Sequence, residues 1–157
     1  MNKIKAIFLL LLVFCFAMLT AFFFEENYNA FVRQLFKAFQ GNKIQFVGKG
    51  FQLFASWYFL IAFGLFSVLL TFLLYGLINK IRLIHLSLTI LLFFFTTIAT
   101  SFIDSTGYVV ECTACQDGIR SLHYSDVNYD FHFIISLLFG LLPLLYAFTR
   151  RLISKAR

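Results

Sequence analysis

Charged residues are missing from four long stretches of this sequence. Residues 6–24, 51–78, 83–103 and 133–149 contain no Asp, Glu, Lys or Arg. A helix needs about 20 mostly apolar residues to cross the hydrocarbon core of a membrane, so each stretch is long enough, or nearly so, to span it. The alternation of polar and apolar residues that marks the strands of a membrane barrel is also missing. We therefore expect the spans to be helical.

The predicted fold is an all-α, polytopic membrane protein with one membrane domain, residues 1–157. Of these residues 61% are hydrophobic, and the two loops left between the stretches are too short to bury cores of their own. Small residues four apart, such as Ser136 and Gly140, favour close helix contact, and we expect a compact antiparallel bundle. The expected transmembrane helices are 6–24, 53–78, 83–103 and 131–149, and the expected outer loops are 25–52 and 104–130.

The scarcity of polar groups in the stretches argues against several functions. Besides cysteine and tyrosine, the only ionisable side chains in the expected transmembrane helices are His85 and His132, both near ends, so coupled transport and proton pumping are disfavoured. Serine-nucleophile motifs, phosphate-binding glycine loops and the H-E-x-x-H zinc motif are absent. These absences favour a protein that is not an enzyme and that carries no cofactor.

The net charge of +6 is explained by topology rather than by nucleic-acid binding. With the N-terminus in the cytoplasm, the short inner segments carry eight Lys and Arg, while the longer outer loops carry five. The positive-inside rule then predicts that both termini are cytoplasmic and that both large loops lie outside. A bacterial inner membrane is the simplest location. The eight inner cations are Lys3, Lys5, Lys80, Arg82, Arg150, Arg151, Lys155 and Arg157.

The first outer loop has the pattern of an amphipathic helix, because apolar residues recur in it at helical spacing. Asn27 suits the N-cap of this helix and Gly41 suits its end, whereas residues 44–46 alternate too briefly to predict a strand. The helix either lies on the membrane surface and docks a protein partner, or folds onto the mouth of the bundle. The candidate partner-binding residues are Tyr28, Phe31, Leu35 and Phe39.

The second outer loop holds Cys112 and Cys115 at C-x-x-C spacing. One interpretation is a structural disulfide formed in an oxidising compartment, which would stiffen the loop. A second is a redox-active pair that cycles between dithiol and disulfide, although Glu111 next to Cys112 disfavours the thiolate. A third is a metal site. Its weak candidate ligands are Cys112, Cys115, His123 and His132, residue types that suit zinc or copper.

Four spans with an outer cysteine pair resemble two families of quinone-linked, disulfide-forming membrane oxidases: the bacterial thiol oxidases and the vitamin K epoxide reductases. The likeness rests on the layout and on Cys112 and Cys115, and it implies thiol–disulfide exchange at that pair. Both families use a second, shuttle pair of cysteines, whereas the only other cysteine here is Cys15, within the first apolar stretch. In size and layout the chain also resembles immunity proteins against pore-forming bacteriocins.

These observations favour a non-enzymatic integral membrane protein, either an accessory or assembly subunit or an immunity-type protein. It would bind another membrane or periplasmic protein through its outer loops and would otherwise contact membrane lipid. The alternative is a quinone-linked thiol–disulfide oxidoreductase that uses Cys112 and Cys115 as its catalytic residues.

Experiments on Cys112 and Cys115 distinguish these two functions. If Cys112 and Cys115 form only a structural disulfide, alkylation after denaturation should find both oxidised, and the double Ser variant should keep most of its function. A redox enzyme would instead give a trapped mixed disulfide with its partner protein in a Cys115→Ser or Cys112→Ser variant. The neighbouring thiol that normally breaks this disulfide is missing in either variant. We expect no trapped partner on non-reducing gels. Complete loss of function in both folded single variants would favour the oxidoreductase.

Overall fold

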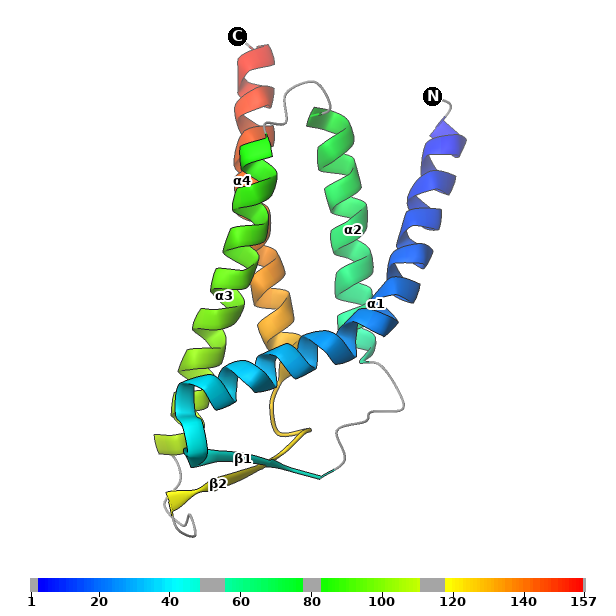
Figure 1. The fold of residues 1–157 in the computed structure, drawn as a ribbon. Helices are drawn as coiled ribbons and strands as arrows, with labels where there is room; N and C mark the ends of the chain where they lie inside the picture. Colours follow the sequence, from blue (N-terminus) through cyan, green and yellow to red (C-terminus); the bar gives the residue numbers. More distant parts are fainter. Residues whose placement is uncertain (1–2, 49–55, 78–82, 111–117, 157) are drawn as a thin grey trace.

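Helices make up most of the computed structural model, which describes residues 3–48, 56–77, 83–110 and 118–156 (Figure 1). The elements in chain order are α1 (Lys3–Gln40), a 3-10 turn η1 (Gly41–Lys43), β1 (Ile44–Val47), α2 (Trp57–Leu77), α3 (Leu83–Val110), β2 (Arg120–His123) and α4 (Tyr129–Ala156). Among these residues, three apolar helical segments are long enough to cross a membrane, and they lie in α1, α3 and α4. The apolar part of α2, Trp57–Leu73, is shorter. The prediction of a helical membrane protein is confirmed, whereas the number of spans stays a prediction.

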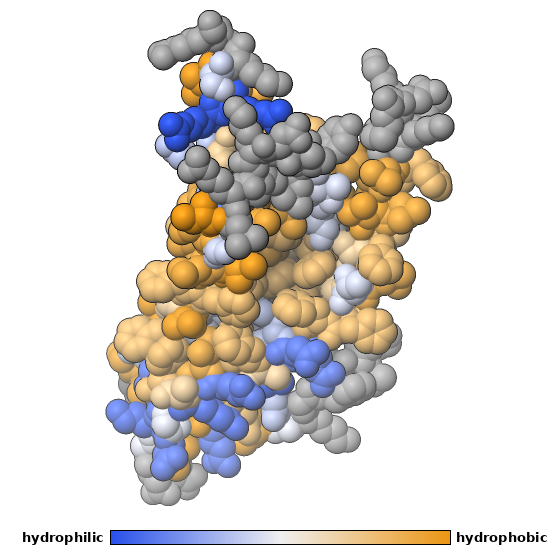
Figure 2. Space-filling model, turned by 45° about the horizontal axis from the view of Figure 1, so that its top comes forward, coloured by the Kyte–Doolittle hydropathy of each residue, from blue (hydrophilic) through white to orange (hydrophobic). Residues whose placement is uncertain are grey.

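Large apolar side chains cover the outside of the helices. Phe8 on α1, Phe95 on α3 and Tyr146 on α4 are 67%, 63% and 64% exposed. Figure 2 shows apolar residues across the middle of the visible face, with hydrophilic residues toward both ends. A water-soluble protein rarely exposes so large an apolar surface, whereas lipid covers it without cost. The protein is therefore membrane-embedded.

The two ends of the molecule differ. The start of α1, the end of α2, the start of α3 and the end of α4 lie together at one end (Figure 1). The opposite end carries β1, β2 and the last part of α1, which runs across the ends of the other helices. We call the latter the strand end. It contains described parts of both predicted outer loops.

The first span and the predicted surface helix form one helix, α1, of 38 residues. Asn27 therefore does not begin a helix; its side-chain amide donates to the Phe23 carbonyl oxygen, one turn earlier. The prediction that Gly41 ends the helix is confirmed, since α1 stops at Gln40 and Gly41 has a φ of 57°. α1 is bent along its length (Figure 1). The Thr20 hydroxyl donates to the Ala17 carbonyl oxygen, a bond of the kind that bends helices.

Helices α3 and α4 run in opposite directions and approach closely at Gly140. A Cβ added at Gly140 would lie 3.3 Å from both the Thr89 carbonyl oxygen and the Phe93 Cβ of α3. One turn of α4 earlier, the Ser136 hydroxyl lies 2.8 Å from the Thr97 hydroxyl, and both residues are fully buried. The predicted small-residue pair on α4 is thus a contact face of this helix pair.

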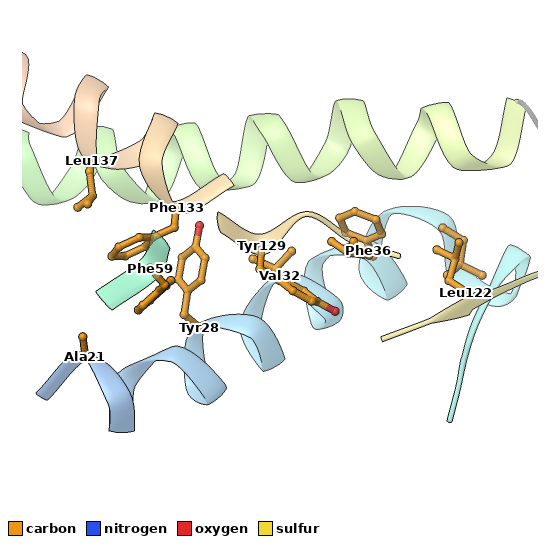
Figure 3. Close-up of a cluster of buried hydrophobic side chains, with 11 residues drawn as sticks. Ala21, Tyr28, Val32, Phe36, Phe59, Leu122, Tyr129, Phe133 and Leu137 are labelled. Carbon is orange, nitrogen blue, oxygen red and sulfur yellow. The ribbon is translucent and has the colours of Figure 1, made fainter. Parts of the chain in front are cut away.

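Aromatic rings gather around Phe133, which is 1% exposed (Figure 3). Its ring centroid lies 3.9 Å from that of Phe59 on α2, in a stacked arrangement. The rings of Tyr28 on α1 and Phe93 on α3 meet Phe133 edge-on, at 5.1 and 6.0 Å. Phe133 on α4 therefore contacts a ring from each of the other three helices. Such aromatic pairs add about 0.5–1.5 kcal/mol beyond the area they bury.

Two short strands correct the all-α prediction. β1 pairs with β2 in parallel, with Ile44 beside Arg120 and Val47 beside His123. Ile44 and Leu122 are buried, and they belong to the same apolar cluster as Val32 of α1. The short alternation in residues 44–47 was not enough to predict a strand. The partner strand comes from the other loop, and local alternation does not reveal such a pairing.

Replacing Gly140 by Leu should destabilise the protein by about 1–3 kcal/mol, because the larger side chain cannot fit against the α3 backbone. The measurement is thermal unfolding in mild detergent. Gly107→Leu is the matched control, since Gly107 also lies in a helix but has open space beside it. Equal stability of the two variants would contradict the packing described here.

Candidate functional site

The strand end carries most of the polar structure among the described residues. We define the end layer as residues 25–47 and 118–130, which comprise the second part of α1, η1, β1, β2 and the segment that leads into α4 with the first two residues of α4. It buries the apolar side of α1, with Val32 and Phe36 both at 0% exposure. Its outer surface carries exposed polar side chains such as Gln34, Lys37 and Ser121. The amphipathic pattern of the sequence thus separates a buried side from an exposed side.

Cations and rings stabilise the end layer at its surface. The Arg33 guanidinium carbon lies 4.8 Å from the centre of the Tyr124 ring and 5.7 Å from that of Tyr129. The Lys37 ammonium lies 6.0 Å from the centre of the Phe46 ring on β1. These contacts, each worth about 0.5–1 kcal/mol at exposed sites, connect α1 to both loops.

The predicted partner-binding residues occupy different environments. Tyr28 is 3% exposed and lies inside the aromatic cluster, so it is not available at the surface. Phe31 and Leu35 are half-buried, and the Phe31 ring lies 6.0 Å from the Phe94 ring of α3. Phe39 is 37% exposed and meets the Phe102 ring of α3 at 5.3 Å. This segment therefore packs against the other helices, which is the arrangement expected if it folds onto the mouth of the bundle.

His132 lies at the first turn of α4 and is 1% exposed. Its Nε2 is 3.0 Å from Asp104 Oδ2, and its Nδ1 is 2.9 Å from Thr100 Oγ1, both on α3. Because a carboxylate can only accept, Nε2 carries a proton in this arrangement. The Ser136 hydroxyl donates to the His132 carbonyl oxygen. Both ring nitrogens are satisfied, so the arrangement explains how a polar ring is buried between two apolar helices.

Gln40 extends this polar contact to α1. Its side-chain amide donates to the Ser105 and Thr106 hydroxyls of α3, at 3.3 and 3.1 Å. Ser105 is fully buried, so the end of α1 is fixed on α3 by bonds that water does not reach freely. Sequence reasoning did not single out Gln40, because its bonding partners lie 65 and 66 residues further along the chain.

Ser56 connects three helices at the start of α2. Its backbone N–H donates to both oxygens of Glu25 on α1, at 3.0 and 3.1 Å. Its hydroxyl donates to Asp130 Oδ2 on α4, at 2.6 Å. The Leu60 N–H bonds to the Ser56 carbonyl oxygen, which makes Ser56 the N-cap of α2. Two carboxylates thus lie at the positive end of the α2 dipole, a favourable position for them.

The start of α4 has a cap of its own. The Asn128 side-chain oxygen accepts a hydrogen bond from the Phe131 N–H, so Asn128 is the N-cap. Asp126 closes the turn before it, where its carboxylate accepts from the His123 N–H. The backbone N–H at the third position of α4 thus bonds to Asn128 rather than to Asp126 or Asp130.

The predicted cysteine and metal sites remain predictions. Cys112 and Cys115 lie outside the described residues, and Cys15 is an exposed free thiol on α1. Of the other candidate ligands, His123 is exposed on β2, whereas His132 is buried and bonded to Thr100 and Asp104. Within the described ranges, no three His, Cys, Asp or Glu side chains are placed to hold a metal ion.

Comparison with known proteins found no matching family, no matching curated protein and no matching solved structure.

Replacing His132 by Leu should lower the free energy of unfolding by about 1–3 kcal/mol, because it removes the two hydrogen bonds that the buried His132 ring makes to α3. Thermal unfolding in detergent measures the change. His123→Leu provides the comparison: it alters an exposed histidine and should stay within about 0.5 kcal/mol of the parent protein. If both variants lose the same stability, the His132 contacts do not hold the helices.

Proposed function

We propose that all four apolar helices cross the membrane, with the end layer outside and both termini in the cytoplasm. The 21 residues of α2 extend about 31 Å as a helix, close to the roughly 30 Å thickness of the hydrocarbon core. Support for the orientation comes from the excess of Lys and Arg in the segments at the other end. A common side for the two termini is supported by Figure 1, in which α1 begins and α4 ends at the same end of the molecule.

We further propose that the protein is a non-enzymatic accessory or assembly subunit that binds another membrane or periplasmic protein through the end layer. The observation that carries this proposal is the parallel pairing of β1 with β2. Two loops far apart in the sequence are thereby combined into one ordered layer, which simple connectors between spans do not need. The exposed polar side chains of this layer come from both loops.

The bonding of the buried polar groups supports a structural role for them rather than a catalytic one. His132 of α4 bonds to Thr100 and to Asp104 of α3, and the Thr97 and Ser136 hydroxyls bond to each other deeper along that interface. Hydrogen bonds of this kind hold transmembrane helices together. The protein-binding surface is then the exposed side of the end layer.

Photo-crosslinking tests the proposal. A photoreactive phenylalanine analogue placed at Gln34 or Ser121 should give an adduct of the same size in native membranes, because these exposed residues lie on the two parts of the end layer. Ser154 is the matched control, since it is exposed at the far end of α4 and should give no such adduct. Mass spectrometry identifies the protein.

Two results would contradict the proposal. If neither Gln34 nor Ser121 gives an adduct, or if Ser154 gives the same one, the end layer is not the binding surface. An adduct with a cytoplasmic protein would contradict the proposed orientation.

A further inference from the structure

An open pocket of about 250 Å³ lies between α2 and α3, with α4 at its inner wall. One side is formed by α2, which contributes Phe66, and the other by residues 89–94 of α3. The inner wall contains Leu137 and Gly140 of α4, both buried, and Phe24 of α1 lies at the margin. Figure 1 shows α4 behind and between the other two helices. The pocket therefore extends from the surface of the bundle to its interior.

The wall of the pocket is apolar. Among the described residues that line it, none is charged and only Thr89 is polar. The Thr89 hydroxyl oxygen is itself buried, so the wall presents no polar atom. An apolar cavity of about 150 Å³ already stays free of water and takes up a molecule such as benzene. Hydrocarbon, rather than water, therefore suits this larger pocket.

The mouth of the pocket opens on the lipid-covered surface of the protein. Its residues on α3 and α4 fall within two of the helical segments that are long enough to cross a membrane. Ile90 and Phe94, at the mouth, are 58% and 47% exposed. Thr89 and Phe94 are separated by about 8 Å along the helix axis, enough for a segment of one hydrocarbon chain. A partner helix, about 10–12 Å in diameter with its side chains, exceeds the pocket.

Arg151 indicates which kind of chain reaches the pocket. It follows Leu137 by fourteen residues, close to four helical turns, and so lies on the same side of α4. Arg151 is half-buried, whereas Arg150 and Leu152 beside it are exposed, in agreement with this placement. Along α4, Arg151 is about 17 Å from Gly140, close to half of the roughly 30 Å hydrocarbon core. A lipid whose phosphate lies beside Arg151 thus has a chain of the right reach.

We propose that this pocket holds one acyl chain of an anionic phospholipid, with the phosphate beside Arg151. The lipid comes from the leaflet at the end of the molecule where α4 finishes. Basic side chains at that depth attract anionic headgroups, while van der Waals contact with the apolar wall retains the chain. The inference goes beyond the proposed partner binding and does not depend on it, since it needs only the membrane environment of the helices.

Native mass spectrometry of the full-length protein tests the site. The protein is released from nanodiscs that contain equal amounts of dioleoylphosphatidylglycerol, which is anionic, and dioleoylphosphatidylcholine, which is not. One lipid should remain bound under activation that removes the others. Phosphatidylglycerol should exceed phosphatidylcholine in this position by about fivefold, the preference that one cation near the membrane surface gives.

Matched variants locate the lipid. Ile90→Trp should lower the fraction that retains a lipid by about tenfold, because the larger side chain takes the place of several methylene groups. Leu91→Trp is the control, since Leu91 is 62% exposed on the same helix but does not line the pocket. Arg151→Gln should abolish the preference for phosphatidylglycerol, whereas Arg150→Gln should keep it. Circular dichroism and gel filtration confirm that each variant is folded.

Equal lipid retention by Ile90→Trp and Leu91→Trp would overturn the proposal, and so would retention of detergent in place of lipid by the parent protein. Equal effects of Arg151→Gln and Arg150→Gln would reject a phospholipid as the occupant. If Ile90→Trp does not fold, Phe24→Trp and Phe23→Trp decide, because Phe24 lines the pocket and the exposed Phe23 does not. Equal retention by that pair rejects the site, whatever the crosslinking experiment on the end layer shows.

Discussion

The packing of rings around Phe133 is the contact on which the helix arrangement depends, because rings from α1, α2 and α3 all meet there. In lipid, apolar side chains gain little by leaving their surroundings for a helix interface, so close packing has to supply the attraction. Edge-on and stacked rings provide it near the strand end. Away from this cluster, the first part of α1 diverges from α3 and α4 (Figure 1) and exposes large side chains such as Phe8 and Phe16.

Hydrogen bonds between polar groups fix how the helices are rotated within this apolar packing. The Thr97–Ser136 and His132–Thr100 contacts fix α3 against α4, while Ser56 fixes the start of α2 between Glu25 and Asp130. Each of these bonds joins different helices, so the rotation of each helix about its axis is specified and not only its position. The same bonds hold the Glu25 and Asp130 carboxylates at the start of α2.

Much of the fold was predictable from local pattern. The apolar stretches gave the helices, Gly41 marked the end of α1, and the spacing of Ser136 and Gly140 marked a contact face. The same reasoning misjudged the start of the amphipathic segment. Asn27 is a good N-cap residue, but nothing between residues 24 and 28 breaks a helix, so α1 continues through it.

The sequence by itself determined the features that depend on a single segment: the presence of a helix in each apolar stretch and the apolar surface that it exposes. The tertiary structure decided the features whose partners are distant in the sequence. Glu25 serves the start of α2 rather than its own helix, β1 exists because β2 lies beside it, and His132 is buried because Asp104 and Thr100 bond its ring. Hydrogen bonding is satisfied by whichever donor or acceptor lies nearest in space, and spacing along one segment does not contain that information.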